Sequence, residues 1–597
     1  MIYRLKRSLT AGELSPLMYG RTDLDRYKHG CRELTNAYIK PQGPVMRRPG
    51  TQFLYDMSTL FNTNSGGEDI AAYRLVDFVF DETQAYCIIF LTGDGGTTLI
   101  YFAAYDATND VWGLVASGGS PYYVTSGLTN FSAASFDYAQ SKDVLFIAYG
   151  AGPPAQLARN THTSWALSTI TFTGSPSKWT TGDYPQHVSF YEQRLVFAAT
   201  DSYPQHLWFS ETGDFFNFTL GTSGSDPFEI QIKSERHNKI QWLASGAKLS
   251  VGTIGDEWVI SGGSATFTIE NVQTNRYSAR GSEDIRPVVV GSSILYIERL
   301  GRVVNEFIYN YDSASYVSIN LSILSPHLTD DYNIIRWSYQ QVPNSIVWCT
   351  RSDGVMLALT FQREHQVIGW ALHSTEGIFK DVCCTPNDDY RETDTWILVE
   401  REIDGTDYMY LERMHQEFLS QDVEEAWMVD SGLQYDNPGV PITTVTGLGH
   451  LEGKEVSILT NGAVHPRQTV ASGSIELNFS SDKITIGLPY TSRIKPLSLE
   501  LGLEEGTSIG RQQRITNIGV YLYRSLGMWI GKDEDEMEEV PFRLPTDLTG
   551  QGVPLFSGIR KVAFPEGYDN EAIIVIEQRQ PLPMIVVAIV DESEVYN

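Results

Sequence analysis

Short apolar runs separated by polar turns dominate the chain from about residue 70 to residue 415. In the typical unit an apolar run meets a polar turn such as Glu82–Gln84, and a second, more apolar run follows. Runs of this length with turn residues between them favour β-strands joined as hairpins. Seven pairs of runs follow this plan, with leading positions at Phe78, Phe136, Phe190, Trp242, Val289, Trp337 and Cys383.

The spacing of these leading positions predicts a repeat of about 45 to 55 residues, which is typical of propeller blades. One hairpin leaves its own apolar face uncovered, whereas stacked blades cover one another. The pattern therefore predicts a mainly β chain with a β-propeller-like platform over residues 70–427. A large β-sandwich, or two of them, is the alternative, because the repeats share a pattern rather than identical residues.

Residues 1–69 are expected to form a separate basic segment with a short helix and turns. Its first fifty residues hold ten Lys and Arg against four Asp and Glu. Apolar residues recur there at spacings of three and four, which indicates one face of a helix, although Gly30 interrupts the pattern. These apolar residues are Leu24, Tyr27, Cys31, Leu34 and Tyr38. Pro41–Pro44 and Arg48–Gly50 then predict sharp turns.

Two further regions follow the platform. Residues 428–500 are predicted to be an inserted small β-barrel, because Val456–Leu459 runs into Asn461-Gly462, a hairpin sequence. Residues 501–597 return to long strands that would complete the platform. The run at 533–539 holds six acidic residues and one Met, which predicts an exposed acidic loop.

Composition sets limits on function. Apolar residues make up 42% of the chain and charged residues 20%, so there is material for a large core. The 73 Asp and Glu outnumber the 44 Lys and Arg, giving a formal charge of −29. This charge argues against wrapping a nucleic acid, because a DNA-binding protein neutralises phosphates with cations. It does not argue against a passage that DNA crosses without being held.

Sequence motifs for catalysis and cofactors are missing. The chain has no GxxxxGK[ST], HExxH, GxSxG or EF-hand pattern, and its five cysteines include no CxxC pair. We therefore predict no enzyme activity, no cofactor and no metal. The first residues lack the apolar core of a signal peptide, which predicts folding in a cytoplasm.

A sugar-cleaving propeller is the alternative for an enzyme. Sialidase-type propellers carry repeated Ser-x-Asp-x-Gly-x-x-Trp turns. The nearest match here is Ser352-Asp353-Gly354, which lacks both the spacing and the tryptophan.

One stretch near the N-terminus resembles a known family in both residues and spacing. It comprises Ala11–Pro16, Tyr19–Tyr27, Gly30–Arg32, Asn36, Pro41–Pro44 and Arg47–Thr51. Looser matches lie at Tyr184–Val188, Glu192–Leu195, Trp208–Ser210, Asp214–Phe218, Gly255–Trp258 and Gly487–Tyr490. These segments resemble the tail tubular protein B, or nozzle, proteins of short-tailed bacteriophages.

The resemblance implies a structural virion protein at the lower end of a phage tail tube, assembled in the host cytoplasm. It implies a homo-hexameric ring around a channel for DNA ejection, with double-stranded DNA in transit and not specifically bound. The implied partners are an adaptor ring, tail fibres or spikes, and a tail needle or plug; no membrane span is expected. The alternative is a glycan- or receptor-binding propeller at the tail surface, including a glycosidase.

Charge suggests two hypotheses for such a ring. An acidic channel wall would repel phosphates, so that DNA slides through. Arginines of the basic segment would pair with acidic surface on a neighbouring subunit or on the adaptor, because guanidinium groups bind carboxylates in a bidentate manner. These interface candidates are Arg21, Arg26, Arg32, Arg47 and Arg48.

Overall fold

A computed structural model describes residues 2–107, 109–234, 238–387, 392–498, 502–503, 506–508, 510–545, 552–564 and 567–596. The chain divides into two compact units. Unit 1 comprises residues 1–57, 338–382 and 392–597, and unit 2 comprises residues 58–337 and 383–391.

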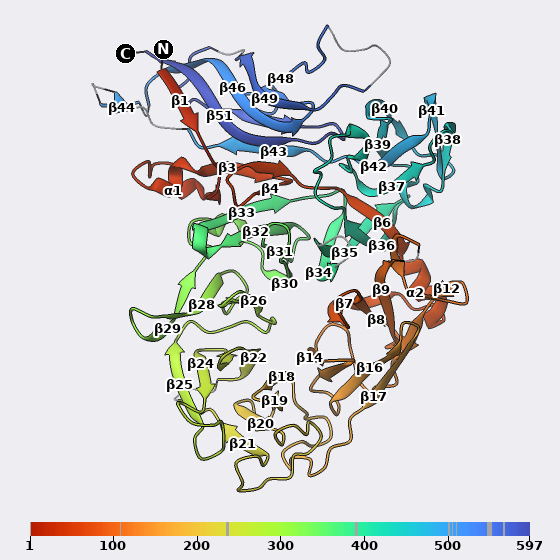
Figure 1. Ribbon diagram of the computed structural model, residues 1–597, viewed down its shortest axis with the longest axis vertical. Helices are drawn as coiled ribbons and strands as arrows, with labels where there is room; N and C mark the ends of the chain where they lie inside the picture. The colour runs from red at the N-terminus through yellow and green to blue at the C-terminus, as the bar shows by residue number, and fades with distance from the viewer. Residues whose placement is uncertain are drawn as a thin grey trace. The chain divides into compact units, whose positions relative to one another are not determined.

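Unit 2 is a series of antiparallel sheets in which each strand pairs with the next along the chain (Figure 1). The first sheet consists of β7 (Ile70–Val79), β8 (Ala85–Gly93), β9 (Thr98–Asp106) and β10 (Val111–Leu114), with β13 (Tyr123–Thr125) beside β9. The second sheet consists of β14 (Asp137–Ser141), β15 (Val144–Ala148), β16 (Ala155–Thr161) and β17 (Ser164–Thr169). The third sheet consists of β18 (His187–Tyr191), β19 (Arg194–Ala198), β20 (His206–Phe209) and β21 (Phe228–Gln231). The fourth consists of β22 (Ile240–Ser245), β23 (Leu249–Thr253), β24 (Glu257–Ser261) and β25 (Gln273–Ser278). The fifth consists of β26 (Val288–Val290), β27 (Ser293–Ile297), β28 (Val304–Asn310) and β29 (Ser315–Asn320). A short helix, α2 (Met57–Ser65), precedes them, and β11 (Ala116–Ser117) pairs with β12 (Ser120–Pro121).

The sheets of unit 2 share cores with their neighbours on both faces. On β19, Leu195 and Phe197 belong to the core that contains Phe146 of the second sheet. Val196, which lies between them, belongs to the core that contains Val251 of the fourth sheet. Because successive side chains of a strand point to opposite faces, this alternation stacks the sheets face to face. The prediction of a mainly β chain is confirmed, and four of these five sheets have four strands.

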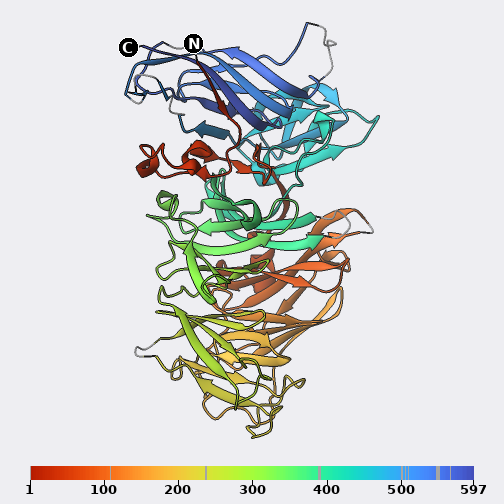
Figure 2. The same ribbon diagram turned by 60° about the vertical axis from the view of Figure 1, so that its left-hand side comes forward.

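Unit 1 is built from larger sheets that include strands from distant parts of the chain. One six-stranded sheet contains β1 (Ile2–Lys6), β4 (Ala37–Ile39), β5 (Val45–Arg47), β46 (Gln513–Ser525), β49 (Phe556–Ala563) and β51 (Ile585–Val595). A ten-stranded sheet contains β2 (Gly12–Glu13), β3 (Gly30–Thr35), β30 (Ile334–Gln340), β31 (Ile346–Arg351), β32 (Met356–Gln362), β33 (Val367–His373), β43 (Ser492–Pro496), β47 (Trp529–Gly531), β48 (Met537–Glu539) and β50 (Val575–Gln578). In Figure 2, as in Figure 1, the red N-terminal strands lie beside the blue C-terminal strands. The two sheets share one core, to which Leu34 of β3 and Ile518 of β46 both belong.

The predicted helical face in the basic segment is mostly wrong. Helix α1 spans only Asp25–Lys28, and the chain then enters β3 and β4. Strand β3 pairs with β2 in parallel and with β43 in antiparallel orientation. Gly30 lies so close to Leu14 that a Cβ there would come within 2.4 Å of its Cδ1. Pairing with distant strands therefore overrides the local helical pattern.

The region 428–500 contributes strands to an eight-stranded sheet and has a core of its own. The sheet contains β6 (Thr51–Asp56), β34 (Ile378–Asn387), β35 (Glu392–Ile403), β36 (Thr406–Met414), β37 (Asp430–Asp436), β39 (Glu455–Thr460), β40 (Ala463–Thr469) and β42 (Lys483–Leu488). Beside it β38 (Ile442–Thr446) pairs with β41 (Ser474–Ser481), and the two sets enclose a core that includes Leu451, Ile458 and Ile486. A short pair, β44 (Gly502–Leu503) and β45 (Gly506–Thr507), lies after β43.

Replacing Gly252 with alanine should weaken unit 2. Gly252 lies opposite the buried Trp242, and a Cβ there would come within 2.1 Å of the indole Cε2. Because an over-packed core must distort, we expect Gly252→Ala to lower the free energy of unfolding by about 1–3 kcal/mol. Calorimetric unfolding of the two proteins measures this. Gly113→Ala is the control, because nothing lies within 4 Å of a Cβ there. Equal losses in both variants would contradict the close packing of Trp242 on Gly252.

Candidate functional site

Two of the predicted interface arginines lie inside unit 1. The exposed fractions of Arg47 and Arg48 are 1% and 0%. Arg48 forms a bidentate ion pair with Asp430, with Nη1 2.7 Å from Oδ1 and Nη2 2.6 Å from Oδ2. Its Nε donates to Asn36 Oδ1 at 3.0 Å, and its guanidinium carbon lies 4.0 Å from the centre of the Tyr490 ring.

Arg47 lies against the same tyrosine and bonds to backbone. Its Nη2 donates to the Tyr490 carbonyl at 2.7 Å, and its Nη1 donates to the carbonyls of Gln580 and Leu582. Neither Arg47 nor Arg48 therefore presents a cation at the surface. The assignment of these two residues as interface candidates is corrected: the turn that contains them folds inward because Asp430 and the carbonyls satisfy them.

The electrostatics of Asp430 favour its ionised form beside Arg48. Burial acts to raise the pKa of Asp430, but the Arg48 guanidinium beside it outweighs that effect and holds the pKa below its usual value. A second buried pair lies on β35 and β36, where Arg401 Nε donates to Glu412 Oε1 at 2.7 Å. Thr51 of β6 donates its hydroxyl to the other oxygen of Glu412 at 2.5 Å, so the basic segment also contacts this pair.

The other three arginines are nearer the surface. Arg21 pairs with Asp23 at 2.9 Å, and both side chains are more than half exposed. Arg26 donates to the carbonyl of Ile368 at 3.2 Å. Arg32 pairs with Glu571 at 2.7 Å, and its own side chain is only 15% exposed. The interface role of these three residues stays a prediction.

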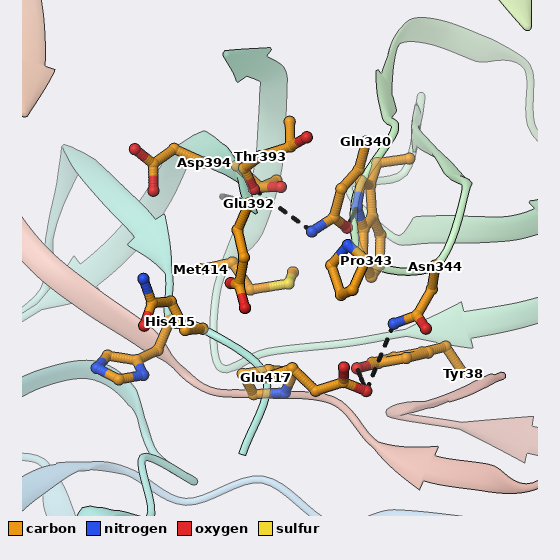
Figure 3. A pocket seen from close by; sticks show the side chains of 14 residues that line it. Tyr38, Gln340, Pro343, Asn344, Glu392, Thr393, Asp394, Met414, His415 and Glu417 are labelled. Atoms are coloured by element: carbon orange, nitrogen blue, oxygen red, sulfur yellow. Dashed lines mark hydrogen bonds between the residues drawn. The ribbon is translucent and has the colours of Figure 1, made fainter. Parts of the chain in front are cut away.

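A small polar cavity lies beside the buried tyrosine Tyr38 (Figure 3). Its volume is about 20 Å³, which is room for about one water molecule. Glu417 accepts hydrogen bonds from the Tyr38 hydroxyl at 3.2 Å and from Asn344 at 3.4 Å, and it pairs with Lys40 at 2.5 Å. Burial, and next the nearby Glu417 carboxylate, raise the pKa of Glu392. The cavity is too small for a substrate.

Unit 2 has a polar cluster at the first strands of its second and third sheets. The Asp137 carboxylate lies 3.4 Å from Arg286 Nη1 and 3.7 Å from His187 Nδ1. Burial acts to lower the pKa of His187, but the Asp137 carboxylate beside it outweighs that effect and the pKa is raised. The Trp337 indole donates to the Arg286 carbonyl at 2.7 Å. Side chains of the chain itself therefore fill this polar cluster. His187 belongs to the segment Tyr184–Val188, which is one of the looser matches to the resembling family.

Sequence reasoning missed the partners in both clusters. Asp430 and Glu412 carry no local motif, and Arg286 is separated from Asp137 by three sheets along the chain. The five cysteines are free and buried. Within the described ranges no group of three or more His, Cys, Asp and Glu side chains has a geometry for a metal ion. No helix in that part of the chain combines the length and hydropathy of a membrane span.

No known protein-family model matches the sequence, and no curated protein matches it. Solved structures show distant likenesses. The C-terminal WD40 domain of Sif2 has 9% identity and a TM-score of 0.32, with 62% of this chain and 99% of that chain covered. Raptor from Chaetomium thermophilum has 10% identity and a TM-score of 0.36, with 63% and 29% covered. A luciferin-regenerating enzyme has 8% identity and a TM-score of 0.28, with 47% and 90% covered.

Replacing Arg48 with methionine should destabilise unit 1 strongly. The change leaves the Asp430 carboxylate buried without its cation, and we expect the free energy of unfolding to fall by about 3–5 kcal/mol. Calorimetric unfolding measures this loss. Arg21→Met, which removes an exposed pair, is the control and should change stability little. A loss in Arg48→Met no larger than in Arg21→Met would contradict the account.

Replacing Glu392 with glutamine should stabilise unit 1 at neutral pH. Because the pKa of Glu392 is raised, its ionised form weakens the fold as the pH rises through the folded-state pKa. We expect Glu392→Gln to unfold at a higher temperature than the natural chain near pH 8, with the gain disappearing below about pH 4. Thermal unfolding across this pH range measures the difference.

Glu364→Gln removes the same charge from an exposed position and is the control. A gain for Glu392→Gln that persists unchanged at low pH, or a loss at pH 8, would show that the buried charge is not the cause.

Proposed function

We propose that this chain is a structural virion protein: a tail nozzle that forms the distal part of a short phage tail tube and the channel for DNA ejection. One observation supports this most strongly. Two segments on which the family resemblance rests, Arg47–Thr51 and Gly487–Tyr490, contact each other in unit 1, where Arg47 and Arg48 lie on the ring of Tyr490. Residues from distant parts of the sequence thus form one buried cluster.

Other resembling segments also contact one another. In unit 2, Arg194 of Glu192–Leu195 donates to the carbonyl of Ser210 at 2.6 Å, and Ser210 ends the segment Trp208–Ser210. The amide of Leu195 donates to the Ser210 hydroxyl at 2.9 Å. Contacts of this kind shape turns and cores rather than a catalytic centre, which favours a shared architecture as the basis of the resemblance.

The face-to-face sheets of unit 2 support the finer architectural proposal. We infer that they are blades of a propeller-like platform with a repeat of about 45 to 55 residues, because neighbouring sheets bury both faces of their central strands. The same platform would carry the contacts to an adaptor ring, to fibres or spikes, and to a needle or plug.

Charge supports passage of DNA rather than its capture. Six copies of a chain with a formal charge of −29 would form a strongly acidic ring. Such a ring repels phosphates, and DNA would cross it without sequence-specific contacts. A glycan-binding or glycosidase function is the alternative.

The purified chain should assemble without holding DNA or cleaving sugars. We expect native mass spectrometry to find six copies, alone or after addition of the adaptor ring protein of the same phage. At about 150 mM salt we expect no retention of duplex DNA at protein concentrations up to about 100 μM, where ordinary non-specific binders retain it. A monomer that turns over a glycan, or a chain that binds duplex DNA at micromolar concentration, would contradict the proposal.

A further inference from the structure

Strand β1 of unit 1 buries its charged side chains and exposes its apolar ones. Its charged residues Arg4 and Lys6 point into the unit and are 5% and 6% exposed, whereas Tyr3 and Leu5 point outward and are 65% and 47% exposed. Soluble antiparallel sheets usually bury the apolar set and expose the polar set. The sequence of β1 therefore does the opposite of what a solvent-facing edge of a sheet needs.

The inward charges are fully engaged. Arg4 Nε donates to Asp591 Oδ2 at 2.5 Å, and Lys6 Nζ donates to the carbonyls of Gly30 at 2.7 Å and Leu497 at 2.9 Å. Burial lowers the pKa of Lys6 to about 8. Burying these cations carries a cost, so the outward direction of Tyr3 and Leu5 is a specified feature rather than an accident of a loose terminus.

The apolar surface continues across the neighbouring strands. Leu5 lies opposite Val590 of β51, which lies opposite Gly519 of β46. Two residues along β46, Tyr521 lies opposite Ile559 of β49. Residues that face one another on paired strands point to the same side of the sheet, so these side chains form one surface. We call it the outer face, and its large exposed members are Tyr3, Leu5, Tyr521, Tyr523 and Ile559.

A bare backbone position lies in the middle of the outer face. Gly519 is flanked by Ile559 Cγ2 at 3.3 Å and Val590 Cβ at 3.8 Å from the place of a Cβ. A glycine inside a strand gives up side-chain packing, and here it leaves room for the Ile559 side chain on the same face. The five exposed side chains offer about 500 Å² of surface, which reaches the size of the largest patch on a typical monomer.

Charges near the outer face indicate what covers it. Arg7 follows β1, is exposed and has no ion pair among the described residues. Lys561 on β49 is 62% exposed, but its ammonium pairs with Glu592 of β51 at 3.3 Å. The same unit carries an acidic exposed hairpin, in which residues 532–536 join β47 to β48 and include Asp533, Asp535 and Glu536. Glu534 of this hairpin pairs with Arg493 of the same chain. One chain thus presents both an apolar face with cations and a separate acidic projection.

We propose that the outer face docks on a second copy of this chain, with the acidic hairpin of that copy reaching Arg7. This contact joins two different patches, and contacts of that type close into rings when the rotation between copies allows. The inference rests on the proposed ring function and names the surface that would hold the ring together. A surface of this size with a charged rim approaches the roughly 800 Å² per partner of a stable interface.

Substitutions on two separate strands test the outer face. Leu5→Asp and Ile559→Asp each place a charge on it, and we expect each to reduce the assembled fraction at least tenfold at about 10 μM protein, measured by mass photometry. Ile323→Asp, at an isolated exposed apolar position of unit 2, is the matched control and should assemble normally. Unchanged far-ultraviolet circular dichroism shows that each variant is folded. Normal assembly of both outer-face variants overturns the inference, as does a natural chain that stays monomeric.

A charge exchange tests the second half of the contact. We expect Arg7→Glu to weaken assembly, and the further changes Asp535→Lys and Glu536→Lys in the same chain to restore it in part. Restoration supports the pairing of the outer face with the acidic hairpin, and its failure overturns that pairing. The interface and the proposed function can fail separately. Six-copy rings that survive every outer-face substitution would rule out this interface and leave the nozzle proposal intact.

Discussion

The buried ion pair between Arg48 and Asp430 is the constraint on which unit 1 depends. It connects the N-terminal segment to the first strand of the region 428–500, and Tyr490 at the end of that region lies against the same guanidinium. Two charges without access to water tolerate little displacement, because either one left alone is costly. The strands that precede and follow Arg48 are therefore fixed in the sheets where they pair.

The repeating part of the fold follows from the sequence, and the N-terminal part does not. The apolar run before Glu192 and the run after it predict the hairpin of β18 and β19, because both strands are local and alternate between two cores. The pattern through Leu24 and Leu34 predicts a helix that forms only at Asp25–Lys28. Pairing of β3 with β43, more than four hundred residues away, leaves no local trace in the chain.

The same limit applies to the candidate site. A run of two arginines followed by Pro49-Gly50 has the composition of a surface turn, and only the position of Asp430 shows that it is buried. Gly50 lies so close to the Val429 carbonyl that a Cβ would come within 1.9 Å of the oxygen, which accounts for a glycine there. The family resemblance includes these residues as one segment, whereas physical reasoning from the sequence predicted exposed arginines where the structure buries them.

The buried ion pairs of unit 1 hold together strands from distant parts of the chain. The central claim is that copies of the chain surround a passage for DNA. Electron cryo-microscopy of phage particles that carry this protein tests the claim most directly. The account predicts a six-fold ring of this chain at the lower end of the tail, around an opening wide enough for duplex DNA. Particles whose tails lack the chain, or that hold it only as separate copies on the tail surface, would contradict it.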